Sequence, residues 1–256
     1  MPLTLIKTLN GTNFEDWNES LDLYLTITNM FNMQFCSPCD APVQKGDKLS
    51  KSQCPQNDNR VEMEKVSYAF ALNSLIYVQV CTRPDIVFAI NVIGIYLSDP
   101  GLGHWKAVKM VFRYLQETKD HMLTYKKFDQ LQVIFYSDSD FVDCPDDRKS
   151  TSGFVFIMVG GSISWKSVKQ TLTTTSTMEA EYVVCYEATC QAMCLKNLIS
   201  DFHIVESISR PLVIYCDNIV IVHFSQNNIS STRSKHFDIK FLFVNYRKSF
   251  RFSNLD

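Results

Sequence analysis

The second half of the chain predicts an α/β domain with a mixed sheet and flanking helices, and three observations support that prediction. Residues 131–136 form a nearly continuous apolar run, as expected of a strand buried on both faces. Gly160-Gly161 separates two strand-like runs and is a hairpin signal. A long helical pattern over 177–199 leads to another apolar run over 212–216. Strand, hairpin, helix and strand in this order are typical of an α/β layer.

Ahead of this domain the chain predicts helices rather than strands. Residues 1–35 contain one short amphipathic pattern with too little surface to fold alone. Residues 36–60 are polar and interrupted by three prolines and a glycine, which is typical of a linker. Residues 61–128 and 129–256 are expected to form the helical segment and the α/β domain. The helical segment contains three patterns, over 66–80, 86–97 and 104–116.

The remaining elements of the α/β domain follow from the same patterns. Strands over 154–159 and 162–166 are expected on either side of the glycine pair. A short helix from Asn218 and a further helical segment near Asp238 are expected after the last apolar run.

Composition describes an ordinary globular protein, with 46% apolar and 20% charged residues. A net charge of −2 gives little reason to expect a nucleic-acid partner, so such contacts would need local basic patches or metal ions. Lys106, Lys109 and Arg113 form one such stripe on a predicted helix, where a solvated face is the alternative.

The chain shows no targeting segment. Its start lacks the cationic stretch and long apolar core of a secretory signal. Arg83-Pro84-Asp85 splits the most apolar region into pieces too short to span a membrane. Nine irregularly spaced cysteines, with Cys36 and Cys39 as the one C-x-x-C pair, indicate free thiols rather than a zinc site. We therefore expect a soluble protein of a reducing compartment, with no membrane partner.

Three carboxylates fall where α/β sheets place functional sites. Asp138 and Asp217 end predicted strands, and Glu179 opens the long helix. Clustered carboxylates repel one another unless hard cations such as Mg²⁺ or Mn²⁺ bind them. Each residue also has a structural explanation: Glu179 as the return arm of a capping box begun by Ser176, the aspartates as a helix cap and a turn residue. Spacing alone leaves both interpretations open.

Seven motifs in the second half follow one another in a fixed order, and such a series is far more specific than one short motif. They occupy residues 136–141, 147–153, 163–166, 169–172, 176–182, 215–218 and 234–238. Over roughly residues 131–248 the chain thereby resembles the ribonuclease H domain of copia-type retrotransposon polyproteins. Residues 80–86 and 100–115 resemble the tail of the adjoining reverse transcriptase, and residues 9–17 resemble the start of the capsid-type polyprotein.

The resemblance implies a ribonuclease H-like fold preceded by a helical reverse-transcriptase remnant. It also implies hydrolysis of the RNA strand of an RNA–DNA hybrid with two Mg²⁺ or Mn²⁺ ions. By motif match, Asp138 would bridge both ions, while Glu179 and Asp217 would each hold one. Groove shape and 2′-hydroxyls would identify the hybrid. Its backbone has four candidate contacts, each with plain surface charge as the alternative: Arg148, Lys149, Lys166 and Lys169.

Departures from the family pattern lower the activity that we expect. Residues 141–143 read Phe-Val-Asp where the family has Trp-Ala-Gly, and Ile219 and Val220 replace smaller residues, which would crowd a metal pocket. The family continues into another strand and a helix that supplies a fourth carboxylate. We therefore expect a domain truncated at its C-terminus, with an uncovered sheet edge. Asp238 precedes that strand and is a poor substitute.

The expected function is a weak or lost hybrid endoribonuclease. The alternatives are a non-catalytic nucleic-acid-binding remnant and an inactive relic. Nothing in the chain resembles the paired aspartates of a polymerase, an aspartic-protease motif or a zinc knuckle, so no polymerase, protease or integrase activity is expected. Polyproteins of this kind act in cytoplasmic particles, which favours the cytoplasm, with the nucleus as the alternative.

Overall fold

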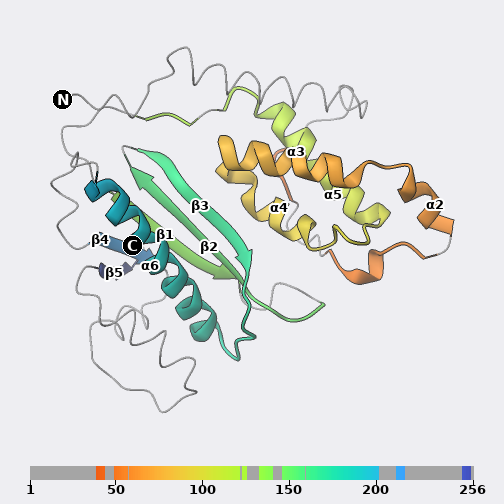
Figure 1. Cartoon of the computed structure of the whole chain (residues 1–256). Coiled ribbons are helices and arrows are strands. Elements are labelled where there is room, and N and C mark those ends of the chain that lie inside the picture. The colour runs from red at the N-terminus through yellow and green to blue at the C-terminus, as the bar shows by residue number, and fades with distance from the viewer. Residues whose placement is uncertain are drawn as a thin grey trace. The chain divides into compact units, whose positions relative to one another are not determined.

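The computed structural model describes nine stretches of the chain (Figure 1). These are residues 39–43, 49–56, 58–121, 123–125, 133–140, 146–158, 160–201, 212–216 and 250–254. The predicted N-terminal segment 1–35, Asp217, Asp238 and the helices expected around them lie outside the described residues.

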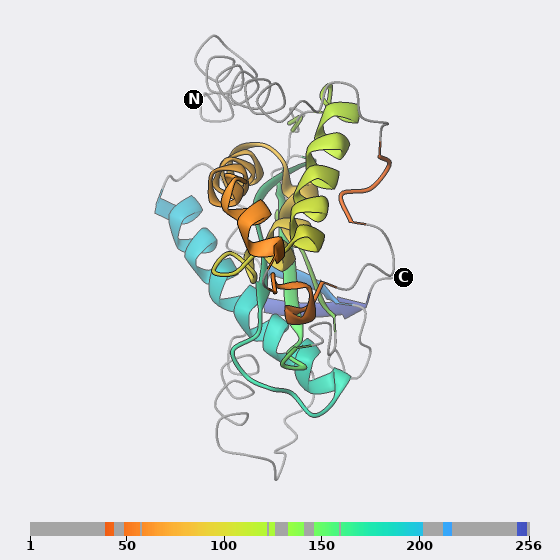
Figure 2. The same ribbon diagram turned by 90° about the vertical axis from the view of Figure 1, so that its right-hand side faces the viewer.

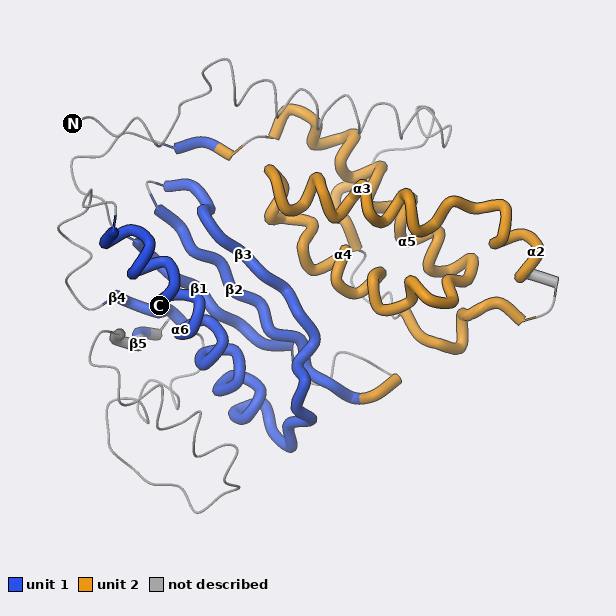
Figure 3. The backbone as a smooth tube through the Cα atoms, viewed as in Figure 1, with its two compact units in different colours: residues 1–3, 124–144, 148–256 blue, residues 4–123, 145–147 orange. Residues whose placement is uncertain are grey.

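Two compact units divide the chain (Figure 3). Unit 1 comprises residues 1–3, 124–144 and 148–256. Unit 2 comprises residues 4–123 and 145–147.

Unit 2 consists of helices joined by short connections. They are η2 (Lys51–Gln53), α2 (Asp58–Glu64), α3 (Tyr68–Cys81), η3 (Pro84–Ile86), α4 (Val87–Gly94) and α5 (Leu102–Glu117). α3, α4 and α5 confirm the three predicted helices, whereas α2 was not predicted. α4 is shorter than predicted: the turn η3 replaces its start, and it ends at Gly94, a residue type that weakens helices.

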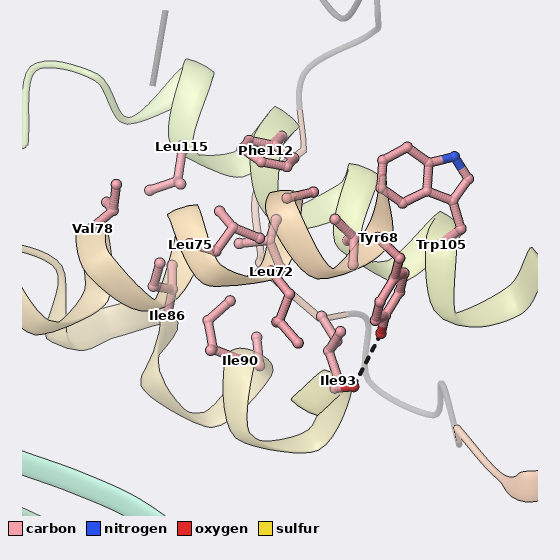
Figure 4. Packing of buried hydrophobic residues seen from close by; sticks show 14 of the residues in the cluster. Tyr68, Leu72, Leu75, Val78, Ile86, Ile90, Ile93, Trp105, Phe112 and Leu115 are labelled. Atoms are coloured by element: carbon pink, nitrogen blue, oxygen red, sulfur yellow. Dashed lines mark hydrogen bonds between the residues drawn. The ribbon is translucent and has the colours of Figure 1, made fainter. Parts of the chain in front are cut away.

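The core of unit 2 lies between α3, α4 and α5 (Figure 4). Leu72, Leu75 and Ile93 are fully buried, and Phe112 is 1% exposed. Tyr68 spans this core and donates its hydroxyl to the carbonyl of Ile93 at 3.0 Å. The broadly apolar character of α3 and α4 therefore reflects burial within unit 2. None of the described helices has the length and apolar composition that crossing a bilayer requires.

Arg83, buried to 7% exposure, connects the end of α3 to the end of α5. Its guanidinium donates to both carboxylate oxygens of Asp85, at 2.9 and 2.6 Å, and to the carbonyl of Thr118 at 3.1 Å. Tyr114 donates its hydroxyl to the same carboxylate at 2.8 Å. Burial alone would raise the pKa of Asp85, but the hydrogen bonds from Arg83 and Tyr114 and the Arg83 charge outweigh it and lower that pKa. The Arg-Pro-Asp part of the motif at 80–86 is therefore a structural connection.

Arg83→Met should lower the free energy of unfolding of unit 2 by about 2–3 kcal/mol at neutral pH. Breaking a buried ion pair costs roughly 3–5 kcal/mol, and partial exposure of Asp85 reduces that cost. Because folding lowers the pKa of Asp85, the pair stabilises the protein above the unfolded pKa, and this contribution is lost as the pH falls through the folded pKa. Denaturant titration of unit 2 at pH 7 and pH 3 measures the effect. A difference between variant and wild type that does not shrink at pH 3 would contradict the ion-pair explanation.

Unit 1 contains a five-stranded mixed sheet with a long helix. Its elements are β1 (Val133–Asp140), β2 (Thr151–Met158), β3 (Gly161–Lys169), α6 (Thr177–Asp201), β4 (Leu212–Cys216) and β5 (Phe250–Asn254). The strand order is β3-β2-β1-β4-β5, with β1, β2 and β3 antiparallel and β4 and β5 parallel to β1. Figure 1 and Figure 2 both show α6 along one face of the sheet, where it contacts β1 and β2. The predicted mixed sheet with a helix packed on it is confirmed.

The core of unit 1 lies between α6 and this face of the sheet. Phe135 and Phe156 pair directly across β1 and β2, and their rings meet edge to face at 4.4 Å between centroids. Phe154 meets Phe156 in the same way at 5.5 Å. From α6, Ala188 and Ala192 are buried against this cluster. Small helix residues opposite large strand residues allow close packing of helix on sheet.

The glycine pair forms the predicted hairpin. Gly160 has φ 77°, a left-handed conformation that favours glycine. Gly161 opens β3 against the ring of Tyr125, and a Cβ there would lie 2.6 Å from that ring. Both glycines are therefore required, one by backbone conformation and the other by close approach.

Two expectations about the strands were wrong. β1 does not end at Asp138 but continues to Asp140, because its antiparallel pairing with β2 extends to Asp140 and Thr151. The edge of the sheet next to β4 is not uncovered, because β5 pairs with β4 along its whole length. The alternation of aromatic and polar residues at 250–253 is a strand signal, but it covers only four residues.

Candidate metal centre

Asp138 lies near the end of β1, with an exposed side chain. Successive side chains of a strand point to opposite faces of the sheet. Val133, Phe135 and Ser137 are buried on the face that α6 covers, so alternation assigns Asp138 to the other face, with Tyr136. The exposed carboxylate of Asp138 has hard oxygen donors of the kind that Mg²⁺ and Mn²⁺ take.

β4 runs beside β1 up to the residue before Asp138. Tyr136 pairs with Tyr215, with ring centroids 5.4 Å apart, and Ser137 pairs with Cys216. Both strands thus bring their chains, in parallel and in register, to the residue that precedes a predicted aspartate ligand. Asp217 itself, and with it the predicted third ligand, lies outside the described residues.

Glu179 lies in the first turn of α6, where it takes part in capping. Its Oε2 accepts hydrogen bonds from the backbone N–H and the hydroxyl of Thr175, both at 2.7 Å. The N–H of Glu179 donates to the hydroxyl of Ser176 at 3.3 Å. The capping role that the sequence left open is therefore present. Both bonds use Oε2, and Oε1 accepts no hydrogen bond within the described part of the chain.

Glu181 was not predicted as part of the site. It is 6% exposed, and its Oε1 accepts the backbone N–H of Ser139 at 3.0 Å and the hydroxyl of Ser139 at 2.6 Å. Ser139 immediately follows Asp138. A signal existed in the sequence: Glu181 shares a helix stripe with Cys185, Ala188 and Ala192, and an acid in an apolar stripe requires a buried partner.

Two cysteines lie directly below the ends of β1 and β4. Cys185 of α6 contacts the hydroxyl of Ser137 at 3.8 Å, and it also interacts with Cys216 of β4. Its hydrogen bond with Cys216, followed by burial, raises the pKa of the Cys185 thiol. A protonated buried thiol is a packing group rather than a nucleophile. The described cysteines, Cys185 and Cys216 among them, are free thiols.

The four predicted basic contacts do not form a single patch. Arg148 is exposed and has φ 54°, which is uncommon for a residue with a Cβ. Lys149 donates to the carbonyl of Thr171 at 3.0 Å and so holds the segment after β3. Lys166 is exposed and Lys169 half-buried, and their spacing of three along β3 assigns them to opposite faces.

Donor chemistry suits a hard divalent cation, but the described residues alone do not complete a site. Asp138 has an exposed carboxylate and Glu179 has one oxygen without a hydrogen bond in the described ranges. Across those ranges, no three His, Cys, Asp or Glu side chains gather closely enough to hold a metal ion. The predicted set of Asp138, Glu179 and Asp217 therefore stays a prediction.

No family model matches the chain, but curated proteins do. A retrovirus-related Pol polyprotein from transposon TNT 1-94 of Nicotiana tabacum is 35% identical over 219 residues, which cover 85% of this chain and 16% of that protein. The corresponding polyprotein from transposon RE2 of Arabidopsis thaliana is 32% identical over 234 residues, 91% of this chain and 15% of that protein. The secreted RxLR effector protein 161 of Plasmopara viticola is 39% identical over 133 residues, 52% of this chain and 94% of that protein. The chain thus spans less than a fifth of the polyproteins it matches.

Solved structures similar to this chain include nucleic-acid enzymes. A ribonuclease H1 isolated from compost overlays with a TM-score of 0.35 and 16% identity, covering 48% of this chain and 84% of that one. A foamy viral protease-reverse transcriptase in complex with double-stranded DNA overlays with a TM-score of 0.48 and 11% identity, covering 78% of this chain and 35% of that one. Both likenesses concern the fold alone.

Proposed function

The chain belongs to the Pol polyproteins of copia-type retrotransposons, and on that premise we propose that unit 1, a ribonuclease H-like α/β fold, cleaves the RNA strand of RNA–DNA hybrids. The partner is the hybrid, and the reaction is hydrolysis supported by two Mg²⁺ or Mn²⁺ ions. The chain spans only part of its relatives, so activity, substrate and partner are proposals for this chain in its own right.

One observation supports this function above the others. β1 and β4 run parallel, and their last described pair, Ser137 with Cys216, immediately precedes Asp138 on one strand and Asp217 in the sequence of the other. Sites in α/β sheets form at the carboxyl ends of such strands. We therefore assign Asp138, Glu179 and Asp217 as the proposed ligands. Asp238 is the weakest candidate, because it precedes β5 in the chain whereas the family's fourth carboxylate follows that strand.

In this assignment each residue has a defined task. Asp138 contributes an exposed carboxylate from a strand whose position the pairing with β2 and β4 fixes. Glu179 contributes Oε1, while Thr175 holds Oε2. Divalent ions bound there would supply an activated water and stabilise the leaving oxygen. Arg148, Lys166 and Lys169 remain proposed contacts to the hybrid backbone, and Lys149 is the least available of the four because it holds Thr171.

A second candidate function is nucleic-acid binding without cleavage. The engagement of Glu179 with Thr175 favours it, since a carboxylate used for capping is a poorer metal ligand. Thr175→Val would remove the hydroxyl bond but keep the backbone bond, which gives a way to test how far capping limits the site.

The test is cleavage of an RNA–DNA hybrid by the full chain. The RNA strand carries a 5′ label, and the reaction contains Mg²⁺ or Mn²⁺, or excess chelator. We expect cleavage of the RNA strand only in the hybrid and only with metal, with matched DNA–DNA and RNA–RNA duplexes left intact. Binding of the hybrid without cleavage would replace the proposal by the second candidate, and folded protein that neither binds nor cuts would overturn both.

A further inference from the structure

We propose that Glu181 is a positioning residue that fixes the direction of the Asp138 side chain by holding Ser139 against α6. This inference rests on the proposed function, because it concerns the geometry of the same site. It adds a residue that is not among the predicted ligands.

The first support is the place of Ser139 in the sheet. β1 pairs with β4 up to Ser137 and Cys216, so the described part of β4 provides no partner for β1 beyond Ser137. On its other side, β1 stays paired with β2 as far as Asp140. The N–H of Ser139 donates to Glu181 Oε1 at 3.0 Å. Glu181 therefore supplies an acceptor beyond the last described β4 pair, and a buried N–H without an acceptor is costly.

The second support is the strength of the contact. A single oxygen of Glu181 accepts both the N–H and the hydroxyl of Ser139, and the hydroxyl bond is 2.6 Å long. Hydrogen bonds between a hydroxyl and a carboxylate have this length when the carboxylate is charged, and they are roughly twice as strong as neutral ones. A side chain that is 6% exposed also has little room to move. The contact therefore holds the Ser139 backbone tightly.

The third support is the alternation of the strand. Ser139 belongs to the face that α6 covers, with Phe135 and Ser137. Since neighbouring residues point to opposite faces, holding Ser139 on the helix side directs Asp138 to the other side. Without the contact, the end of β1 would rely on β2 alone, and Asp138 would be free to turn with the twist of the strand. Partners behind a metal ligand typically account for 10- to 100-fold in affinity.

Mn²⁺ affinity of the full chain, measured by calorimetry, tests this role. We expect roughly 10-fold weaker binding in Glu181→Gln and a smaller loss in Ser139→Ala, which removes the hydroxyl bond and changes no charge. The double variant should bind no more weakly than Glu181→Gln alone. Ser139→Thr keeps both donors and should bind like the wild type. Glu187→Gln, six residues further along α6 or roughly 9 Å along its axis, controls for the loss of a negative charge.

Two metal-free measurements separate positioning from bracing. Hydrogen exchange of the Ser139 amide should be faster in Glu181→Gln, and thermal unfolding without metal shows how much stability is lost. If Glu181→Gln loses stability but binds Mn²⁺ like the wild type, Glu181 only braces the fold and the inference is overturned. If Glu181→Gln does not fold, Ser139→Ala with Ser139→Thr decides, and equal Mn²⁺ affinity in these two overturns the inference.

The failure of the inference and that of the proposed function have different signatures. If Asp138→Asn weakens Mn²⁺ binding and Glu181→Gln does not, only the positioning role is wrong. If the wild type and Asp138→Asn bind Mn²⁺ alike, the proposed site is not at Asp138, and both proposals are wrong.

Discussion

Replacing Asp138 by asparagine is expected to weaken Mn²⁺ binding on the order of 100-fold or more and to abolish cleavage of the hybrid. Asparagine has nearly the same shape as aspartate but carries no charge and offers one carbonyl oxygen. Asp138 is exposed, so the exchange should leave the fold and its stability unchanged. A large loss of metal affinity without a loss of stability would be specific to a ligand.

Asp140→Asn is the matched control for this prediction. Asp140 is exposed, lies two residues further along β1 and by alternation points to the same face as Asp138. It should bind Mn²⁺ and cleave the hybrid as the wild type does. Equal losses in the two variants would indicate general electrostatic attraction of cations to this end of β1, and would contradict a ligand role for Asp138.

Phe156→Ala is expected to lower the free energy of unfolding of unit 1 by about 3–5 kcal/mol. Phe156 is fully buried, and its ring contacts two others, Phe135 at 4.4 Å and Phe154 at 5.5 Å between centroids. Alanine would leave a cavity, and the paired strands and α6 restrict how far the surroundings can close it. A loss of this size is a large part of the stability of an ordinary domain.

Hydrogen exchange of β1, β2 and β3 in increasing urea measures this loss in unit 1 separately from unit 2. Leu198→Ala is the control, because Leu198 belongs to the same unit and is 52% exposed on α6. Its cost should stay below about 1 kcal/mol, as for most exposed positions. A loss for Phe156→Ala no greater than that of the control would show that this aromatic cluster does not hold the sheet together.

The sequence predicted those elements whose local pattern agrees with their environment. The glycine pair specifies the hairpin because Gly160 needs a positive φ and Gly161 a close approach to Tyr125, and both needs show in residue type. The long apolar and amphipathic patterns likewise specified α3, α5 and α6. In these elements, composition and tertiary contacts require the same structure.

The misses have one physical cause, which is pairing between distant parts of the chain. β1 extends through Asp138 to Asp140 only because β2 provides partners there, and an acidic run gives no local strand signal. β5 is a strand because β4 lies beside it. Glu181 was overlooked because nothing near it in sequence shows that its partner is Ser139, which lies on another element.

The mixed direction of the sheet determines the order in which it can be assembled. β1, β2 and β3 are consecutive and antiparallel, so they form from contacts between near neighbours in the chain. β4 reaches β1 only after α6 has been made, since Ile134 pairs with Val213. Contacts between distant residues close slowly because of their loop entropy. On the ribosome, the meander would therefore exist before β4 emerges, and Asp138 would wait on a finished strand for the half of the sheet that brings its neighbour.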